Sequence, residues 1–145
     1  MTVLGIKSIA HLALRVSDLD RSLAFYRDTL GLREMLRLHE ENGDPWLVCL
    51  RISDTQSIEL FPNGSGDRAQ DRDAIAIDHV CLQVECMEKA VSALRNLGIQ
   101  LSAEPQLSHD GNNLCWFDDP DGNCIELVQM LPGNMREEAI KRLSN

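Results

Sequence analysis

Apolar and polar residues alternate along several short stretches of the chain, and the order of these stretches occurs twice. Residues 8–16 alternate with the two-residue period of a strand. Apolar residues then recur at helical spacing up to residue 30. Asp18 is suited to cap the start of this helix and Gly31 to end it. Three more strand-like stretches cover residues 32–38, 46–52 and 56–61. The first half therefore predicts a strand, a helix and three further strands.

The same order returns in the second half. A strand is predicted over residues 75–84, a helix over 87–97 that ends at Gly98, and strands over 99–103, 112–117 and 123–130. Residues 63–74 are polar without periodicity and are predicted to be a linker, and residues 134–143 are predicted to form a tail helix. The repeat indicates a single α+β domain of two tandem modules, 6–62 and 75–130, whose sheets could curl around a cavity.

Two histidines and two glutamates occupy matching positions of the repeat. The histidines are 68 residues apart (79 − 11) and the glutamates 67 (126 − 59), and the strand period places all four on the face away from the helices. The four residues are His11, Glu59, His79 and Glu126. Two imidazoles and two carboxylates suit nickel, cobalt, zinc, iron or manganese better than magnesium or calcium. We therefore predict a divalent metal site.

Charge and composition narrow the range of partners. The formal net charge of −9 disfavours nucleic acid binding, and an anionic substrate would need a local cation. No stretch is long and apolar enough for a membrane helix and no signal peptide is apparent, so we expect a soluble cytoplasmic protein. The five cysteines are scattered and are expected to be reduced thiols; His39 and His109 lack repeat partners and are expected at the surface.

Three segments resemble the vicinal oxygen chelate superfamily, which includes glyoxalases, bleomycin resistance proteins and dioxygenases. They are His-Leu-Ala-Leu-Arg-Val-Ser-Asp-Leu-Asp-Arg-Ser-Leu-Ala-Phe-Tyr at 11–26, Leu-Gly-Leu at 30–32, and Asp-Pro-Asp-Gly-Asn-Cys-Ile-Glu-Leu at 119–127. The resemblance covers about residues 6–130 and implies a pair of βαβββ modules forming an open, barrel-like sheet around a metal.

Within this superfamily the sequence is most similar to glyoxalase I, the lactoylglutathione lyases. The resemblance implies that His11, Glu59, His79 and Glu126 bind the metal, with nickel, cobalt or zinc favoured. It implies proton transfer through a metal-bound enediolate, with Glu126 as the first choice of base and Glu59 as the second. It also implies that Arg15 and Asn63 contact a glutathione adduct, and that the protein is a homodimer. The segments 64–74 and 108–114 depart from the glyoxalase I pattern.

Other members of the superfamily provide alternatives. Ring-cleaving dioxygenases use iron with two histidines and one glutamate, so the presence of Glu59 argues against them. Acyl-coenzyme A epimerases are closer in chemistry but usually have glutamine at one ligand position. Drug-binding resistance proteins typically lack the ligands, and a thiol transferase acting on fosfomycin uses three, so both fit less well.

Overall fold

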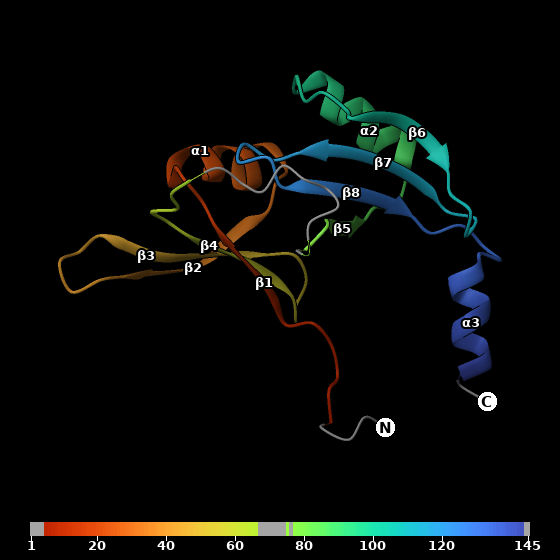
Figure 1. Cartoon of the computed structure of the whole chain (residues 1–145), viewed down its shortest axis with the longest axis horizontal. Coiled ribbons are helices and arrows are strands. Elements are labelled where there is room, and N and C mark those ends of the chain that lie inside the picture. The colour runs from red at the N-terminus through yellow and green to blue at the C-terminus, as the bar shows by residue number, and fades with distance from the viewer. Residues whose placement is uncertain (1–4, 67–74, 76, 144–145) are drawn as a thin grey trace. The chain divides into compact units, whose positions relative to one another are not determined.

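The computed structural model describes residues 5–66, 75 and 77–143 (Figure 1). The chain divides into two compact units, Met1–Asp67 and Arg68–Asn145, and each unit has its own four-stranded sheet. The predicted α+β fold of two tandem βαβββ modules with a C-terminal helix is therefore confirmed. Residues 67–74 of the predicted linker lie outside the described residues, so the linker and the module bounds stay predictions.

The first unit has its helical segment packed on one face of a mixed sheet. Its elements are β1 (His11–Arg15), α1 (Leu19–Leu23), the π-helical η1 (Ala24–Thr29), β2 (Arg33–His39), β3 (Pro45–Arg51) and β4 (Ser57–Phe61). The sheet order is β1-β4-β3-β2, with β1 parallel to β4 and the other pairs antiparallel. The buried core consists mainly of Val16, Leu23, Tyr26, Val48, Leu50, Ile58 and Leu60. Because strand residues alternate, the intervening residues form the opposite face.

The first helix begins as predicted but changes its winding. The Asp18 side chain accepts a hydrogen bond from the backbone N–H of Arg21 at 3.0 Å, which caps α1. From Ala24 the helix widens, and Leu30 donates to the carbonyl of Phe25, five residues back, at 2.9 Å. A π-helical turn of this kind is not visible in apolar spacing, since it leaves the buried stripe nearly unchanged.

The second unit repeats the arrangement and adds a helix. Its elements are β5 (Val80–Gln83), α2 (Met87–Asn96), β6 (Ala103–Leu107), β7 (Asn113–Asp118), β8 (Cys124–Gln129) and α3 (Met135–Leu143). The sheet order is β5-β8-β7-β6, with β5 parallel to β8 (Figure 1). Its core includes Met87, Val91, Leu94, Cys115, Phe117, Ile125 and Leu127.

Two strands of the second unit differ from their predicted ranges. The strand β5 is shorter than expected, and His79 immediately precedes it. The strand predicted over residues 99–103 is wrong, because β6 begins only at Ala103. Instead, Gly98 and Ile99 donate to the carbonyls of Arg95 and Leu94 at 3.0 and 2.9 Å. These bonds form a Schellman motif, in which the apolar residue after the glycine belongs to the helix end.

Candidate metal-binding and catalytic site

The first unit brings together one histidine and one glutamate on the face opposite its helix. His11 begins β1, and the register pairs Ala13 of β1 with Glu59 of β4. Since β1 residues two apart share a face, His11 and Glu59 are diagonal neighbours. Their side chains are 51% and 20% exposed, and Nδ1 of His11 lies 3.7 Å from Oε1 of Glu59. These two residues therefore lie close together within this unit.

The second unit brings together the other pair more tightly. Nε2 of His79 lies 2.9 Å from Oε2 of Glu126, and the two side chains are 30% and 5% exposed. On its other side, Nδ1 of His79 lies 2.6 Å from Oδ2 of Asp78. A carboxylate on the second ring nitrogen fixes the tautomer and orientation of a histidine, as around many metal sites. Asp78 therefore orients the His79 ring, with Nε2 directed toward Glu126.

The two glutamates have different neighbours across their sheets. Glu126 is flanked in register by Cys81 of β5 and Trp116 of β7. The Trp116 ring meets the His79 ring edge to face, with 4.8 Å between centroids. Burial, followed by the nearby Glu126 carboxylate, raises the pKa of the Cys81 thiol to about 11, which keeps it neutral at physiological pH. The buried carboxylate of Glu126 is thus enclosed by a thiol and an indole.

The residues that flank Glu59 across its sheet are smaller than those that flank Glu126. Its partners across the sheet are Ala13 of β1 and Cys49 of β3. This difference agrees with the greater exposure of the Glu59 side chain. Each unit supplies one imidazole–carboxylate pair, and in the described part of the chain no three His, Cys, Asp or Glu side chains form a metal-binding group. The chemistry of each pair suits a borderline divalent metal, but one pair alone is half of a four-ligand set.

Arg15 lies on the same face of β1 as His11, and Asn63 follows the end of β4, the strand that pairs with β1. Arg15 pairs in register with Phe61, and its guanidinium lies 5.6 Å from the Phe61 ring centroid. Its Nη1 donates to the carbonyl of Pro62 at 3.0 Å. Asn63 has a positive φ of 64°, a conformation that asparagine tolerates better than most residues. The structure therefore places the Arg15 cation beside the segment that contains Asn63.

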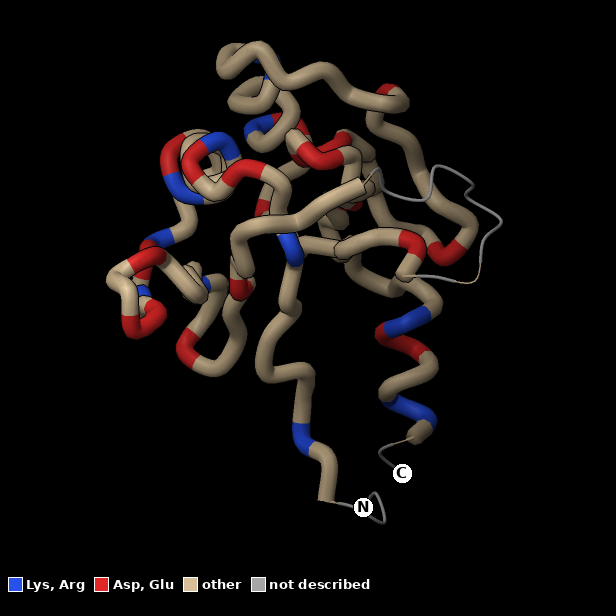
Figure 2. The backbone as a smooth tube through the Cα atoms, turned by 60° about the vertical axis from the view of Figure 1, so that its left-hand side comes forward, with Lys and Arg blue, Asp and Glu red and all other residues tan. Residues whose placement is uncertain are grey.

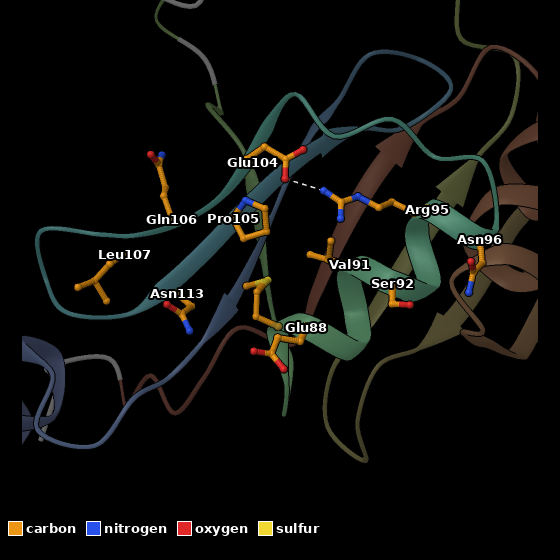
Figure 3. Close-up of a pocket in the computed structure, with 11 residues that line it drawn as sticks. Glu88, Val91, Ser92, Arg95, Asn96, Glu104, Pro105, Gln106, Leu107 and Asn113 are labelled. Atoms are coloured by element: carbon orange, nitrogen blue, oxygen red, sulfur yellow. Dashed lines mark hydrogen bonds and ion pairs between the residues drawn. The ribbon is translucent and has the colours of Figure 1, made fainter.

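A surface groove in the second unit lies on the other face of its sheet. It is formed between α2 and β6, has a volume of about 530 Å³, and is crossed by an ion pair between Arg95 and Glu104 at 2.5 Å (Figure 3). Asn113 lines this groove and pairs in register with Gln129, three residues along β8 from Glu126. An odd spacing along a strand places side chains on opposite faces. The groove is therefore separate from the His79–Glu126 pair.

Sequence reasoning missed two neighbours of His79. Asp78 has a visible signal, because an acidic residue directly precedes the histidine in the second module whereas Ala10 does so in the first. Trp116 has no such signal, since its position beside Glu126 depends on the register of β7 and β8. His39 and His109 are exposed, as expected, and all five cysteines are free.

The described helices include none that is both long and apolar enough to cross a membrane. This finding agrees with the absence of an apolar stretch of that length in the sequence.

Comparison with known proteins relates this fold to proteins of named function. The chain is 34% identical over 126 residues to a lactoylglutathione lyase of Haemophilus influenzae, covering 83% of this chain and 91% of the relative. It is 30% identical over 128 residues to the mitochondrial methylmalonyl-CoA epimerase of Mus musculus, covering 82% and 71%. The crystal structure of a glyoxalase family protein from Enterococcus faecalis matches with a TM-score of 0.73 and 26% identity, covering 84% and 97%.

The sequence profile of one superfamily matches most of the chain, from residue 8 to residue 127, and so includes both imidazole–carboxylate pairs. The chain belongs to the Glyoxalase/Bleomycin resistance protein/Dioxygenase superfamily.

Proposed function

We propose that this protein is a metal-dependent lyase or isomerase of the lactoylglutathione lyase kind, which moves a proton next to a carbonyl group. The observation that carries this proposal is the buried Glu126 carboxylate, 2.9 Å from a histidine that Asp78 holds in place. Similarity to a lactoylglutathione lyase supports the same chemistry. The substrate class is a small molecule with two adjacent oxygens, such as the hemithioacetal of methylglyoxal and glutathione.

The proposed metal ligands are His11, Glu59, His79 and Glu126. Their donor atoms are imidazole nitrogens and carboxylate oxygens, which favour nickel, cobalt or zinc and also suit iron or manganese. When bound, such an ion polarises a carbonyl group and stabilises the negative charge that develops when the adjacent carbon loses its proton. Two imidazole–carboxylate pairs give four protein ligands. The homodimer implied by the resemblance would allow two copies to share ligand pairs.

The proposed bases are the two glutamates, with Glu126 as the first choice. A Glu126 oxygen would take the proton from the carbon next to the carbonyl, and a carboxylate would return it to the neighbouring carbon. The low exposure of Glu126 and its enclosure by Cys81 and Trp116 limit competition from water. Glu59 is the second choice, since its more exposed side chain has smaller neighbours.

Arg15 and Asn63 are proposed to contact the substrate. Stacking on Phe61 and the bond to the Pro62 carbonyl orient the Arg15 guanidinium while its charge is retained. A fixed cation of this kind supplies the local attraction that an anionic substrate needs against a net charge of −9.

Epimerisation is a second candidate function. The similarity to methylmalonyl-CoA epimerase supports it, and the proton would again leave and return to a carbon next to a carbonyl. In that case the proton would return to the carbon that it left. The same residues could serve both reactions, so the substrate distinguishes them.

The test joins metal analysis to two assays. The purified protein is stripped of metal, reloaded separately with nickel, cobalt, zinc, iron and manganese, and assayed with methylglyoxal plus glutathione and with methylmalonyl-CoA. We expect turnover of the hemithioacetal with nickel, cobalt or zinc. Turnover of methylmalonyl-CoA alone would favour the epimerase, and inactivity toward both substrates with every metal would overturn the proposal.

Two variants test the role of Glu126. Glu126→Gln should retain much of the bound metal and lose most of the turnover, because an amide can still provide an oxygen ligand but cannot accept the proton. The matched control is Glu88→Gln, which changes an exposed residue of α2 on the other side of the sheet. Unchanged turnover in Glu126→Gln would contradict the assignment of this base.

A further inference from the structure

The C-terminal helix α3 is anchored at its first turn and is uncovered along the rest of its length. The backbone N–H of Met135 donates to the carbonyl of Asp110 at 2.9 Å, and Nε of Arg136 donates to Oδ2 of the same residue at 2.8 Å. From this anchor the helix extends away from the sheet of its own unit (Figure 1 and Figure 2), and none of the nine residues described for it is buried. The superfamily match ends at residue 127, so α3 lies outside it.

One face of α3 is largely apolar. Met135, Ala139 and Leu143 are spaced four residues apart and therefore follow one another along this face, and Arg142, nearly two turns beyond Met135, lies on the same side. The side chains of Met135 and Leu143 are 65% and 87% exposed. A helix of nine residues is marginal in water by itself, because most helical stability in proteins comes from packing of an apolar face. The exposed face therefore indicates a surface that packs against a partner.

The groove between α2 and β6 is an apolar surface in the same unit (Figure 3). The nearly buried side chains of Met87 and Val91 line it from α2, and the exposed side chains of Pro105 and Leu107 line it from β6. Its volume of about 530 Å³ leaves room for several apolar side chains. Leu107 is the last residue of β6, so the groove ends beside the turn on which α3 is anchored.

The strand β6 favours a helix over another strand as the occupant of this groove. It lies at the edge of its sheet, where an extended peptide could in principle add as a further strand. Pro105, in the middle of β6, has no N–H to donate, and the pairing of β6 with β7 shifts register within the strand. The edge is therefore a poor template for strand addition, whereas the groove beside it suits the apolar face of a helix.

The charges of the helix and of the groove are complementary. Basic residues lie near both ends of α3, with acidic residues between them (Figure 2). Lys141 is paired within the helix at 2.9 Å, whereas Arg142 has no ion pair with any residue that the structure describes. At the groove, Oε2 of the exposed Glu104 binds Arg95, while Oε1 has no partner among the described residues. An apolar helix face with one uncompensated cation thus matches an apolar groove with an acidic group at its rim.

We propose that α3 of one chain packs in the α2–β6 groove of a second copy, which returns its own α3 to the first. Each chain has one such helix beside one such groove, so a two-fold exchange covers both and closes the assembly at a dimer. In this interface the face of Met135 and Leu143 lies over Val91 and Leu107, and Arg142 is beside the acidic rim. The inference rests on the homodimer included in the proposed function, not on the reaction, and names its interface.

The experiment measures dimer dissociation. Sedimentation equilibrium of the full-length, nickel-loaded protein gives the Kd of the dimer. We expect Leu143→Asp to raise this Kd about 30-fold, because a carboxylate would have to enter the apolar groove. Leu107→Asp should do the same from the side of the groove. Leu97→Asp is the matched control, because it makes the same change at an exposed helix end outside the groove, and it should dimerise like the wild type.

An equal mixture of Leu143→Asp and Leu107→Asp tests the exchange itself. Their heterodimer retains one intact contact, between the helix of the Leu107→Asp chain and the groove of the Leu143→Asp chain. The mixture should therefore associate more tightly than either variant alone. A monomeric wild type, an unchanged Kd in either variant, or a mixture that associates no more tightly than its components would overturn the inference.

These outcomes are distinguishable from failure of the proposed function. A dimer whose Kd depends on both leucines, but which turns over neither methylglyoxal–glutathione nor methylmalonyl-CoA, would retain the interface and lose the proposed activity. A monomer that turns over one of these substrates would retain the activity and lose the interface.

Discussion

Nε2 of His79 lies 2.9 Å from Oε2 of Glu126, and Oδ2 of Asp78 lies 2.6 Å from Nδ1 on the other side of the ring. Asp78 therefore orients the histidine toward Glu126. The corresponding contact of the first unit, between His11 and Glu59, is longer at 3.7 Å. In that module Ala10 precedes the histidine. Each module has one imidazole–carboxylate pair, but the two modules differ in how firmly the histidine is held.

The first prediction concerns Asp78. Asp78→Asn should weaken nickel binding by about 10- to 100-fold, because a neutral amide orients the His79 ring less strongly and makes it a poorer ligand. Calorimetric titration of the metal-free protein with nickel measures the change. Asp118→Asn, at the end of β7, is the control and should bind nickel like the wild type. Equal affinity in both variants would mean that Asp78 does not support a ligand.

The second prediction uses the indole beside His79. Binding of cobalt or nickel should quench the fluorescence of Trp116, whose ring centroid lies 4.8 Å from that of His79. Most of the quenching should disappear in Trp116→Phe and persist in Trp46→Phe, since Trp46 packs against Phe61 in the first unit. The reverse pattern would place the metal away from His79.

The third prediction concerns the start of α2. Cys86 makes no capping bond with its side chain, whereas Oε1 of Gln129 accepts from the Met87 N–H at 3.0 Å. Gln129→Ala should therefore lower the free energy of unfolding by about 1 kcal/mol, as for loss of a helix cap. Urea denaturation measures it, with exposed Gln106→Ala as the control. A loss of the same size in the control would show that the effect comes from replacing a strand glutamine with alanine and not from loss of the helix cap.

The fourth prediction concerns pH and the attachment of α3 to the turn before β7, where the backbone N–H of Met135 donates to the carbonyl of Asp110 at 2.9 Å. The hydrogen bond from Ser108, followed by those from Asn112 and Arg136, holds the pKa of Asp110 below its ordinary value of 3.8. Because the folded pKa is the lower one, the attachment is fully stabilised above pH 3.8 and is lost as pH falls through the folded value. The NMR amide signal of Met135 should shift over that range.

In Asp110→Asn the Met135 signal should already be altered at neutral pH and should show little further acid transition. Asp118→Asn again serves as the control. A Met135 signal that titrates identically in all three proteins would show that Asp110 does not hold the helix.

The fifth prediction concerns the turn that carries Asn63. A Cβ on Gly64 would lie 3.0 Å from the carbonyl carbon and oxygen of Val16 and 3.3 Å from Cγ of Arg15. Gly64→Ala should therefore displace residues 62–64 and lower the midpoint temperature of thermal unfolding. It should also weaken the binding of any ligand that contacts Arg15. Ser65→Ala, one residue on, is the control for thermal melting. An unchanged melting temperature in Gly64→Ala would show that the Val16 backbone shifts to accommodate the added Cβ with little loss of stability.

The sequence by itself determined the repeated order of elements and the face of the sheet on which His11, Glu59 and Glu126 lie. Both follow from periodicity, because a strand residue two positions from His11 or Glu126 must share its face. Asp18 as a helix cap and Gly98 as a helix end were likewise predictable, since both act within a few residues along the chain.

The tertiary structure decided what depends on contacts between distant residues. Gln129 caps α2 from 42 residues away, and Trp116 reaches His79 only because β7 pairs with β8 in one register. The assignment of Ile99 to a helix end instead of a strand depended on bonds to Leu94 that an apolar pattern does not encode. The attachment of Arg136 to Asp110 joins residues 26 apart, so local sequence could predict the helix α3 but not the position of its cation.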